Sequence, residues 1–260
     1  MNYKKKNIKM FSSRIIDLVS KLKGIQNRDR VLLPTGSTHF NTILKGGFHP
    51  GMYLIFGANR TGKTQICHQM CLQAYIASSS SIYIDSENTF RPERIKELCT
   101  AQGVDEEQAM KSILVAKVLS NSTLLLKLNE VDKKLETSNT KLLIIDSINN
   151  HFRADQGAIN ISHYELKKNF LKILQKLSDI TQKHNVVLLA TAQISPNFIE
   201  KPIIKEIPVG LQYLNHFFSE FLYLIRNSDK NYVHIINSKS LPENKLPYII
   251  TSRGIEDYVK

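Results

Sequence analysis

The stretch Gly57–Thr64, which reads GANRTGKT, has the residue types and spacing that bind phosphate. In a loop framed by glycines, successive backbone N–H groups turn toward phosphate oxygens, and the helix that follows adds its partial positive charge. The lysine reaches the terminal phosphates, and the threonine hydroxyl binds Mg²⁺. The pattern therefore predicts a site for a nucleoside triphosphate and Mg²⁺, formed by Gly57, Asn59, Arg60, Thr61, Gly62, Lys63, Thr64 and Gln65.

The elements on either side of this loop are those that the motif requires. The apolar run 53–56 indicates a buried strand before the loop, and residues 63–78 indicate a helix after it. A glycine-rich turn with a purely structural role is the alternative interpretation. The match of the whole loop, set between a strand and a helix, argues against that alternative.

Asp146 is a second candidate for binding the metal. It ends the apolar run 141–146, which reads KLLIID and predicts a buried strand. A carboxylate at that position can hold Mg²⁺ and its water shell together with Thr64. Apolar runs that end in Asp are common, so this assignment depends on the phosphate-binding loop as well.

Strand candidates alternate with helix candidates along the chain. Further strands are predicted at residues 81–85, 112–118 and 185–192, and helices from residue 92, at 122–135 and at 162–184. This alternation predicts a three-layer α/β fold with a mainly parallel sheet. Late strands at 220–226, 232–237 and 246–250 complete the sheet, the last two antiparallel, and the Pro- and Lys-rich stretch 195–208 predicts a mobile loop.

The composition indicates an intracellular protein with an anionic partner. The net charge is +12, the excess of Lys and Arg that suits a phosphate backbone, although a merely lysine-rich sequence is the alternative. No apolar run approaches the roughly 20 residues of a membrane span, and the basic start lacks the apolar region of a secretory signal. The three cysteines have no paired spacing, so Cys67 and Cys71 are predicted to be small buried residues rather than disulfide or zinc ligands.

We predict two parts of unequal size. Residues 1–31 form a basic amphipathic helix and a linker, and residues 32–260 form the α/β core. The helix is too short to be an independent domain, so it packs on the core or on a neighbouring subunit.

Several separate motifs resemble the RecA/RadA recombinase family, most closely its archaeal RadA and RadB branch. GANRTGKTQICHQ resembles the Walker A loop of that family, YIDSENTFRPERI its second-strand motif, and LLIIDSINNHFRAD its Walker B segment. TAQI, IPVG and SLPE resemble later signatures in the same order, so the resemblance covers residues 32–260. It implies a RecA-like P-loop NTPase core that binds ATP and Mg²⁺ and carries antiparallel strands at its C-terminal end.

The resemblance also implies roles for single residues. Glu87, expected on the strand adjacent to that of the loop, matches the glutamate that deprotonates the attacking water, and with Lys63 and Gln193 it forms the catalytic set. Arg94 matches an arginine that stacks on adenine, and Gln193 matches a sensor of the terminal phosphate. His216 matches a histidine on the same path. A surface glutamate and a packed core histidine are the alternatives for Glu87 and His216.

Two loops match the DNA-contacting loops of the family, at residues 153–162 and 194–208. They imply that single-stranded DNA binds there. Arg153, Lys201 and Lys205 would contact its phosphates, and Phe198 would stack on a base. Solvated loop lysines are the alternative.

The chain departs from the strand-exchange enzymes of the family in features that serve assembly. It lacks their N-terminal helical domain, and the sequence from Phe11 (FSSR) lacks the alanine of their docking segment. The sequence NSK at 237–239 replaces an Asp-Ser-Pro cap, the first DNA loop lacks Gly-Arg-Gly, and the second has no internal glycine. These differences argue against a filament and against autonomous strand exchange, while they leave other oligomers open.

The leading interpretation is a RadB-like paralogue of RadA that acts in DNA recombination and repair. It would be cytoplasmic and nucleoid-associated, bind single-stranded DNA, hydrolyse ATP slowly and modulate a RadA-type recombinase. A recombination mediator that binds ATP with negligible hydrolysis is the second interpretation. A small-molecule kinase would need an arginine-rich lid and a pocket for a phosphate acceptor, and the sequence shows neither.

Overall fold

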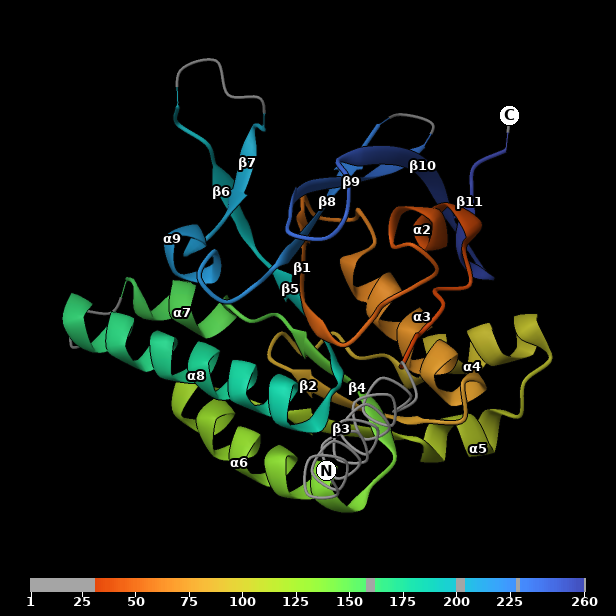
Figure 1. The fold of residues 1–260 in the computed structure, drawn as a ribbon, viewed down its shortest axis with the longest axis horizontal. Helices are drawn as coiled ribbons and strands as arrows, with labels where there is room; N and C mark the ends of the chain where they lie inside the picture. Colours follow the sequence, from red (N-terminus) through yellow and green to blue (C-terminus); the bar gives the residue numbers. More distant parts are fainter. Residues whose placement is uncertain (1–30, 158–161, 200–203, 228–229, 260) are drawn as a thin grey trace, which may run out of the picture. The chain divides into compact units, whose positions relative to one another are not determined.

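The predicted phosphate-binding loop follows a strand in the interior of a sheet (Figure 1). The computed structural model describes residues 31–157, 162–199, 204–227 and 230–259. Within these residues the main sheet has nine strands in the order β11-β10-β9-β8-β1-β5-β4-β2-β3. In chain order they are β1 (Gly51–Gly57), β2 (Ser80–Asp85), β3 (Ile113–Lys117), β4 (Thr140–Asp146), β5 (Val187–Ala192), β8 (Glu220–Arg226), β9 (Asn231–Ser238), β10 (Asn244–Thr251) and β11 (Gly254–Asp257).

The pairing of the strands divides the sheet into two regions. The strands from β8 through β1, β5, β4 and β2 to β3 are parallel, and β8, β9, β10 and β11 pair antiparallel. The predicted α/β fold with a mainly parallel sheet and antiparallel C-terminal strands is confirmed. Because parallel strands end at the same edge of a sheet, the loops after β1, β2, β4 and β5 meet there.

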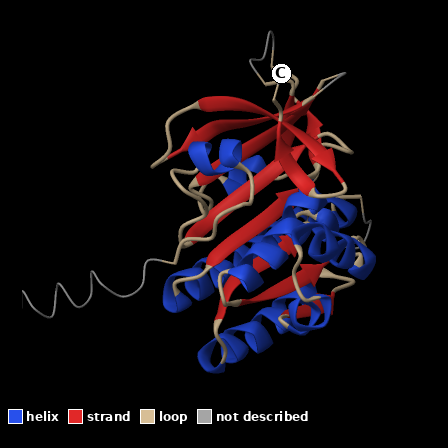
Figure 2. Ribbon diagram, turned by 90° about the vertical axis from the view of Figure 1, so that its right-hand side faces the viewer, coloured by secondary structure: helices blue, strands red, loops and turns tan. Residues whose placement is uncertain are grey.

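Helices cover both faces of this sheet (Figure 2). On one face lie α2 (Thr38–Ile43), α3 (Lys63–Ile76), α4 (Pro92–Gln102) and α5 (Glu106–Lys111). On the other lie α6 (Asn121–Thr137), α7 (Asn150–Asp155), α8 (His163–His184) and α9 (Leu211–Leu214). Alternate residues of β1, namely Met52, Leu54 and Phe56, join the core under this second group, as the period of a strand requires.

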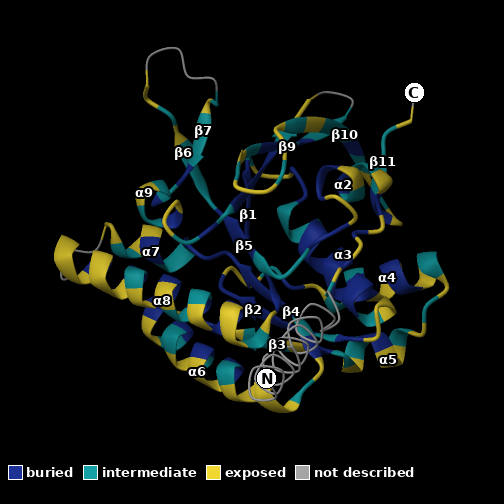
Figure 3. Cartoon of the chain, viewed as in Figure 1, coloured by how far each residue is buried: buried dark blue, intermediate teal, exposed yellow. Residues whose placement is uncertain are grey.

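The central strands are buried, and the outer faces of α6 and α8 are exposed (Figure 3). Cys67 and Cys71 are fully buried in α3, so their interpretation as small buried residues is confirmed. Among the described residues, no three or more His, Cys, Asp or Glu side chains are grouped as metal ligands would be. Within the same residues, every helix is too short or too polar to cross a membrane.

The predicted loop at 195–208 is largely a hairpin. Strands β6 (Ile194–Pro196) and β7 (Glu206–Pro208) pair antiparallel and project away from the main sheet (Figure 1). The prolines favoured an irregular loop, but Pro196 and Pro208 each stand at the end of a strand, where a missing N–H costs little pairing. Residues 200–203 of this segment, and residues 1–30 of the predicted N-terminal helix and linker, lie outside the described residues.

Two expectations about the strands were wrong. β2, which leads to Glu87, is not adjacent to β1, because β5 and β4 lie between them. In a doubly wound sheet the crossovers skip strands, so neighbours in sequence need not be neighbours in space. The late part of the sheet also contains β11, whose short sequence GIED lacks the apolar alternation that marks a strand.

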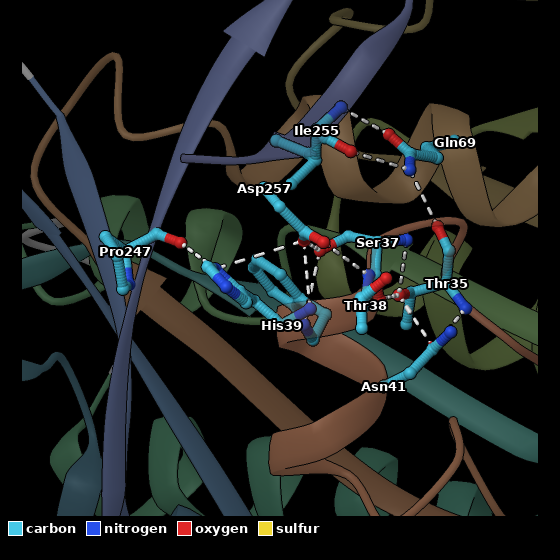
Figure 4. Close-up of polar contacts among 10 residues, drawn as sticks. Thr35, Ser37, Thr38, His39, Asn41, Gln69, Pro247, Ile255 and Asp257 are labelled. Carbon is cyan, nitrogen blue, oxygen red and sulfur yellow. Dashed lines mark hydrogen bonds and ion pairs between the residues drawn. The ribbon is translucent and has the colours of Figure 1, made fainter. Parts of the chain in front are cut away.

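Asp257 of β11 connects the C-terminal end of the sheet to helix α2 (Figure 4). Its carboxylate accepts hydrogen bonds from the Ser37 hydroxyl (2.6 Å), the His39 N–H (2.9 Å) and the Thr38 N–H (3.1 Å). Backbone N–H groups at a helix start have no partner within the helix, and a negative charge there is favourable. Burial by itself raises the pKa of Asp257. The three hydrogen bonds together lower it by more than burial raises it, so the pKa lies below its ordinary value of 3.8.

We expect Asp257→Ala to lower the free energy of unfolding by about 1–2 kcal/mol, because three donors lose their acceptor. Since the pKa is depressed in the folded state, the contribution is complete above the ordinary pKa of 3.8 and is lost as the pH falls below it. Urea unfolding of both proteins at about pH 7 and about pH 3 measures the difference, which should shrink at the lower pH.

Glu107→Ala is the matched control for this prediction. It removes an exposed carboxylate whose ion pair with Lys111 (2.5 Å) lies on the surface of α5. Such pairs contribute little, so the change should stay below about 0.5 kcal/mol. Equal losses in the two variants would contradict the capping role of Asp257.

Candidate nucleotide site

The loops after β1, β2, β4 and β5 enclose a cavity with a volume of about 650 Å³. This volume lies within the roughly 300–1,000 Å³ that small-molecule sites occupy. The lining consists of residues 57–60 and 62–65, Glu87, Thr89, Asp146, Arg153, Gln193, Ile194 and Ile250. The cavity thus brings together the phosphate-type loop, both candidate carboxylates and Gln193.

Two glycines allow the loop to turn tightly beside other strands. Gly57 has φ 148° and Gly62 has φ 98°, values that favour glycine. A Cβ atom at Gly57 would lie 2.1 Å from the carbonyl oxygen of Leu224, and one at Gly62 would lie 2.8 Å from Ile250. Gly62 is also the N-cap of α3, so the first N–H groups of that helix, which lack partners in the helix, stand at the cavity.

Lys63 begins α3, and its side chain turns back over the loop. Its Nζ donates hydrogen bonds to the carbonyl oxygens of Gly57 (2.8 Å) and Ala58 (3.0 Å). Burial lowers the pKa of this amine below its ordinary value, despite the nearby carboxylates. Thr61 is fully buried and donates its hydroxyl to the Ala58 carbonyl (2.9 Å), so it shapes the loop instead of lining the cavity.

Asp146, at the end of β4, accepts hydrogen bonds from four hydroxyl groups. The donors are Thr64 (2.9 Å), Tyr83 (2.7 Å), Thr89 (3.1 Å) and Thr191. The carboxylate is nearly buried, and a buried charge is stable only when it is paired or hydrogen-bonded. The Thr64 hydroxyl beside a single carboxylate is the kind of oxygen set that Mg²⁺ uses together with substrate phosphates. These residues therefore fit Mg²⁺.

Asp85 positions Glu87. The Asp85 carboxylate, at the end of β2, accepts hydrogen bonds from the N–H groups of Glu87 (3.1 Å), Thr89 (3.1 Å) and Phe90 (3.0 Å). Aspartate commonly closes turns in this way, by bonding backbone groups that follow it. The turn places the Glu87 side chain in the cavity lining, where the hydroxyl of Ser147 donates to its Oε1.

Gln193 connects Glu87 to Arg153. Its Nε2 donates to Oε1 of Glu87 (3.0 Å), and its own Oε1 accepts from Arg153 (3.1 Å). It follows β5, which pairs with β4. Its backbone carbonyl accepts from the N–H of Val209 (3.0 Å), which directly follows β7. One residue therefore contacts the cavity carboxylate and the base of the hairpin.

Arg94 lies outside the cavity lining. Its guanidinium donates to Gln65 (2.6 Å) and to the carbonyl oxygens of Thr251 (2.7 Å) and Ser252 (3.0 Å). These bonds attach α4 to the turn between β10 and β11. Its stacking on adenine stays a prediction.

The residues predicted to bind DNA are only partly brought together. Arg153 lines the cavity and bonds Gln193, while Phe198 is 89% exposed beyond the end of β6. Lys205 is exposed on the other arm of the hairpin, and Lys201 lies outside the described residues. His216 is exposed after α9, so the packed-core alternative for it does not hold.

Sequence reasoning missed the polar residues around the two carboxylates, which are Tyr83, Thr89, Ser147, Asn150 and Thr191. Thr191 stands near the end of the predicted strand 185–192, and Ser147 follows Asp146 directly. Their position at strand ends was a usable signal. The contacts of Asn150 depend on where α7 packs, which no local pattern indicates.

Comparison with known proteins gives a family match over most of the chain. The model of the Rad51 family matches residues 26–258. The chain is 31% identical over 242 residues to the meiotic recombination protein DMC1/LIM15 homolog of Mus musculus, covering 86% of this chain and 70% of that protein. It is 29% identical over 238 residues to the DNA repair and recombination protein RadA of Aeropyrum pernix, covering 86% of this chain and 73% of that protein. It is 28% identical over 248 residues to the meiotic recombination protein DLH1 of Candida albicans, covering 89% of this chain and 75% of that protein.

We expect Lys63→Ala to weaken the binding of magnesium–ATP by about 10- to 100-fold, because charge-assisted hydrogen bonds to phosphate are lost. Isothermal titration calorimetry with a non-hydrolysable ATP analogue measures the dissociation constant. Lys96→Ala, on the surface of α4 and paired with Glu106 at 2.8 Å, removes the same charge away from the cavity and should bind as wild type does. An unchanged dissociation constant in Lys63→Ala would remove the phosphate-binding role of the loop.

Proposed function

Because the chain belongs to the Rad51 family, we propose that it is an ATP-dependent, single-stranded-DNA-binding protein of homologous recombination and DNA repair. It hydrolyses ATP slowly at the nucleoid and modulates a full-length recombinase, as a RadB-like paralogue of RadA. The observation that carries this proposal is the direct bond between Glu87 and Gln193 at the wall of a cavity that also holds Lys63 and Asp146.

The cavity supports hydrolysis of the terminal phosphate of ATP. The 57–64 loop and the start of α3 bind the phosphates, and Lys63 offsets their charge. Glu87 takes a proton from a water molecule whose oxygen attacks the terminal phosphorus, and ADP leaves. Thr64 and Asp146 hold Mg²⁺, which neutralises charge on the phosphate oxygens when it is bound. Positioning and charge account for nearly all of the catalysis in such reactions.

The hairpin supports a role for DNA in this reaction. Phe198 offers an exposed ring for stacking on a base, and Lys205 offers a charge for the backbone. The base of the hairpin is bonded to Gln193, so DNA that displaces the hairpin changes the contacts of Gln193 with Glu87. The net charge of +12 favours association with any nucleic acid.

The slow turnover and the accessory role rest on departures from the strand-exchange enzymes. The sequence NSK at 237–239 stands where they carry a cap over the neighbouring ATP, and Lys239 is exposed there. The second DNA loop has no internal glycine. These differences favour a protein that assists a recombinase in place of forming the active filament itself.

The second candidate function is a mediator in which ATP only changes the conformation. It is favoured by the state of Glu87, whose Oε1 already accepts bonds from Ser147 and Gln193. A carboxylate with one oxygen held by two donors is less free to position water. In the mediator, ATP and DNA would bind in a linked manner without phosphate release.

Phosphate release with and without single-stranded DNA separates the two functions. In wild type we expect slow release that DNA increases, whereas Lys63→Ala and Glu87→Gln should each lose about 100-fold or more. Glu93→Gln, an exposed substitution in the first turn of α4, is the control and should match wild type. ATP binding without release would support the mediator, and release that persists in Glu87→Gln would exclude this residue as the base.

Phe198→Ala should weaken the binding of single-stranded DNA by about 5- to 100-fold, because stacking on an aromatic ring is lost. Leu119→Ala is the matched control. Leu119 is 87% exposed and Phe198 is 89% exposed, so both variants remove an exposed apolar side chain, but Leu119 follows β3 and is not part of the hairpin. Fluorescence anisotropy with a labelled oligonucleotide at fixed salt measures both. Equal affinities in the two variants would show that the hairpin does not contact DNA bases.

A further inference from the structure

Every polar atom of the Gln193 side chain is engaged. Nε2 donates to Oε1 of Glu87 (3.0 Å) and to Oδ1 of Asn150 (3.0 Å), and Oε1 accepts from Arg153 (3.1 Å). An amide nitrogen has two hydrogens, so these contacts use both. Gln193 can meet a new group in the cavity only by breaking one of these bonds.

Asn150 is fixed independently of Gln193. It is the first residue of α7, and its Nδ2 donates to the carbonyl oxygen of Ser86 (2.6 Å). Ser86 in turn bonds Ser147 in both directions, through its hydroxyl to the Ser147 carbonyl (2.7 Å) and from the Ser147 N–H (2.8 Å). Asn150 is therefore attached to the same backbone segment that carries Glu87. This bond keeps the side-chain oxygen of Asn150 in place as the acceptor for Gln193.

This arrangement determines which oxygen of Glu87 is available. Oε1 accepts from Ser147 and from Gln193, and among the described residues no group donates to Oε2. A carboxylate whose one oxygen is held by two donors has less freedom to turn toward a water molecule. Asn150 strengthens this restraint, because it stabilises the orientation of Gln193 that contacts Glu87.

We propose that Asn150 is a positioning residue that keeps Gln193 on Glu87 when no DNA is bound and thereby restrains the hydrolysis of ATP. The inference rests on the proposed function, and it concerns the regulation of the same site. DNA on the hairpin draws Gln193 away through its bond to Val209, which frees Glu87. Asn150 is not among the residues that line the cavity, its side chain bonds no described residue of the hairpin, and it acts only through Gln193.

The experiment measures phosphate release by the full-length chain with and without single-stranded DNA in wild type, Asn150→Ala, Gln193→Ala and the double variant. Loss of one hydrogen bond from Gln193 should raise the DNA-free rate of Asn150→Ala by about 3- to 10-fold, while the rate with saturating DNA stays as in wild type. His151→Ala is the control, because His151 follows Asn150 in α7 but bonds the Val118 carbonyl (3.1 Å).

The double variant separates positioning through Gln193 from a general disturbance of α7. If Asn150 acts through Gln193, adding Asn150→Ala to Gln193→Ala changes nothing further, and additive effects would overturn the proposal. A DNA-free rate of Asn150→Ala equal to that of wild type, with DNA stimulation intact, would also overturn it and leave the proposed function standing. If no variant releases phosphate under any condition, both the restraint and the proposed hydrolysis are wrong. Thermal unfolding of each variant identifies any loss of folded protein.

Discussion

The buried carboxylate of Asp146 is the constraint on which the rest of the site depends. A charge in the interior is tolerated only when hydrogen bonds replace the water that it has lost. Here the four hydroxyls come from α3, from β2, from the turn after β2 and from β5. The need to satisfy one carboxylate therefore fixes the distances between the phosphate-binding loop, the Glu87 turn and the strand that leads to Gln193.

The order of strands explains how one side chain can contact both the cavity and the hairpin. β5 lies between β1 and β4, so Gln193 leaves the sheet between the phosphate-binding loop and Asp146. Its backbone is held by Asn149, which accepts from the Gln193 N–H (2.8 Å) and donates to its carbonyl oxygen (2.9 Å). The same carbonyl oxygen accepts from the Val209 N–H (3.0 Å), so a displacement of the hairpin reaches the backbone of Gln193 and, through it, the side-chain amide.

The sequence contains enough to predict the parts of the site that depend on local geometry. Gly57, Gly62 and Lys63 could be assigned because a tight loop before a helix needs those residue types at that spacing. The parallel strands could be predicted because burial on both faces requires unbroken apolar runs. Strand β11 and the hairpin of β6 and β7 pair with segments close in sequence, but they are too short to show the alternation that marks a strand. The separation of β2 from β1 could not be predicted either, because it depends on how segments distant in sequence pair. Asn150 was missed for the same reason, since its two partners are Ser86 and Gln193.

The C-terminal antiparallel strands are part of the candidate nucleotide site as well as the end of the sheet. Ile250 of β10 lines the cavity, and its Cδ1 would lie 2.8 Å from a Cβ atom at position 62, where a φ of 98° also favours glycine. The hydroxyl of Tyr248 donates to the Thr61 carbonyl, which fixes the loop from the same strand. Arg94 joins the turn after β10 to α4, so a move of its guanidinium toward a bound base would release that turn. We infer that a nucleotide bound in this cavity would be linked energetically to the packing of the C-terminal strands, so that a substitution in β10 would alter its affinity without touching the phosphates.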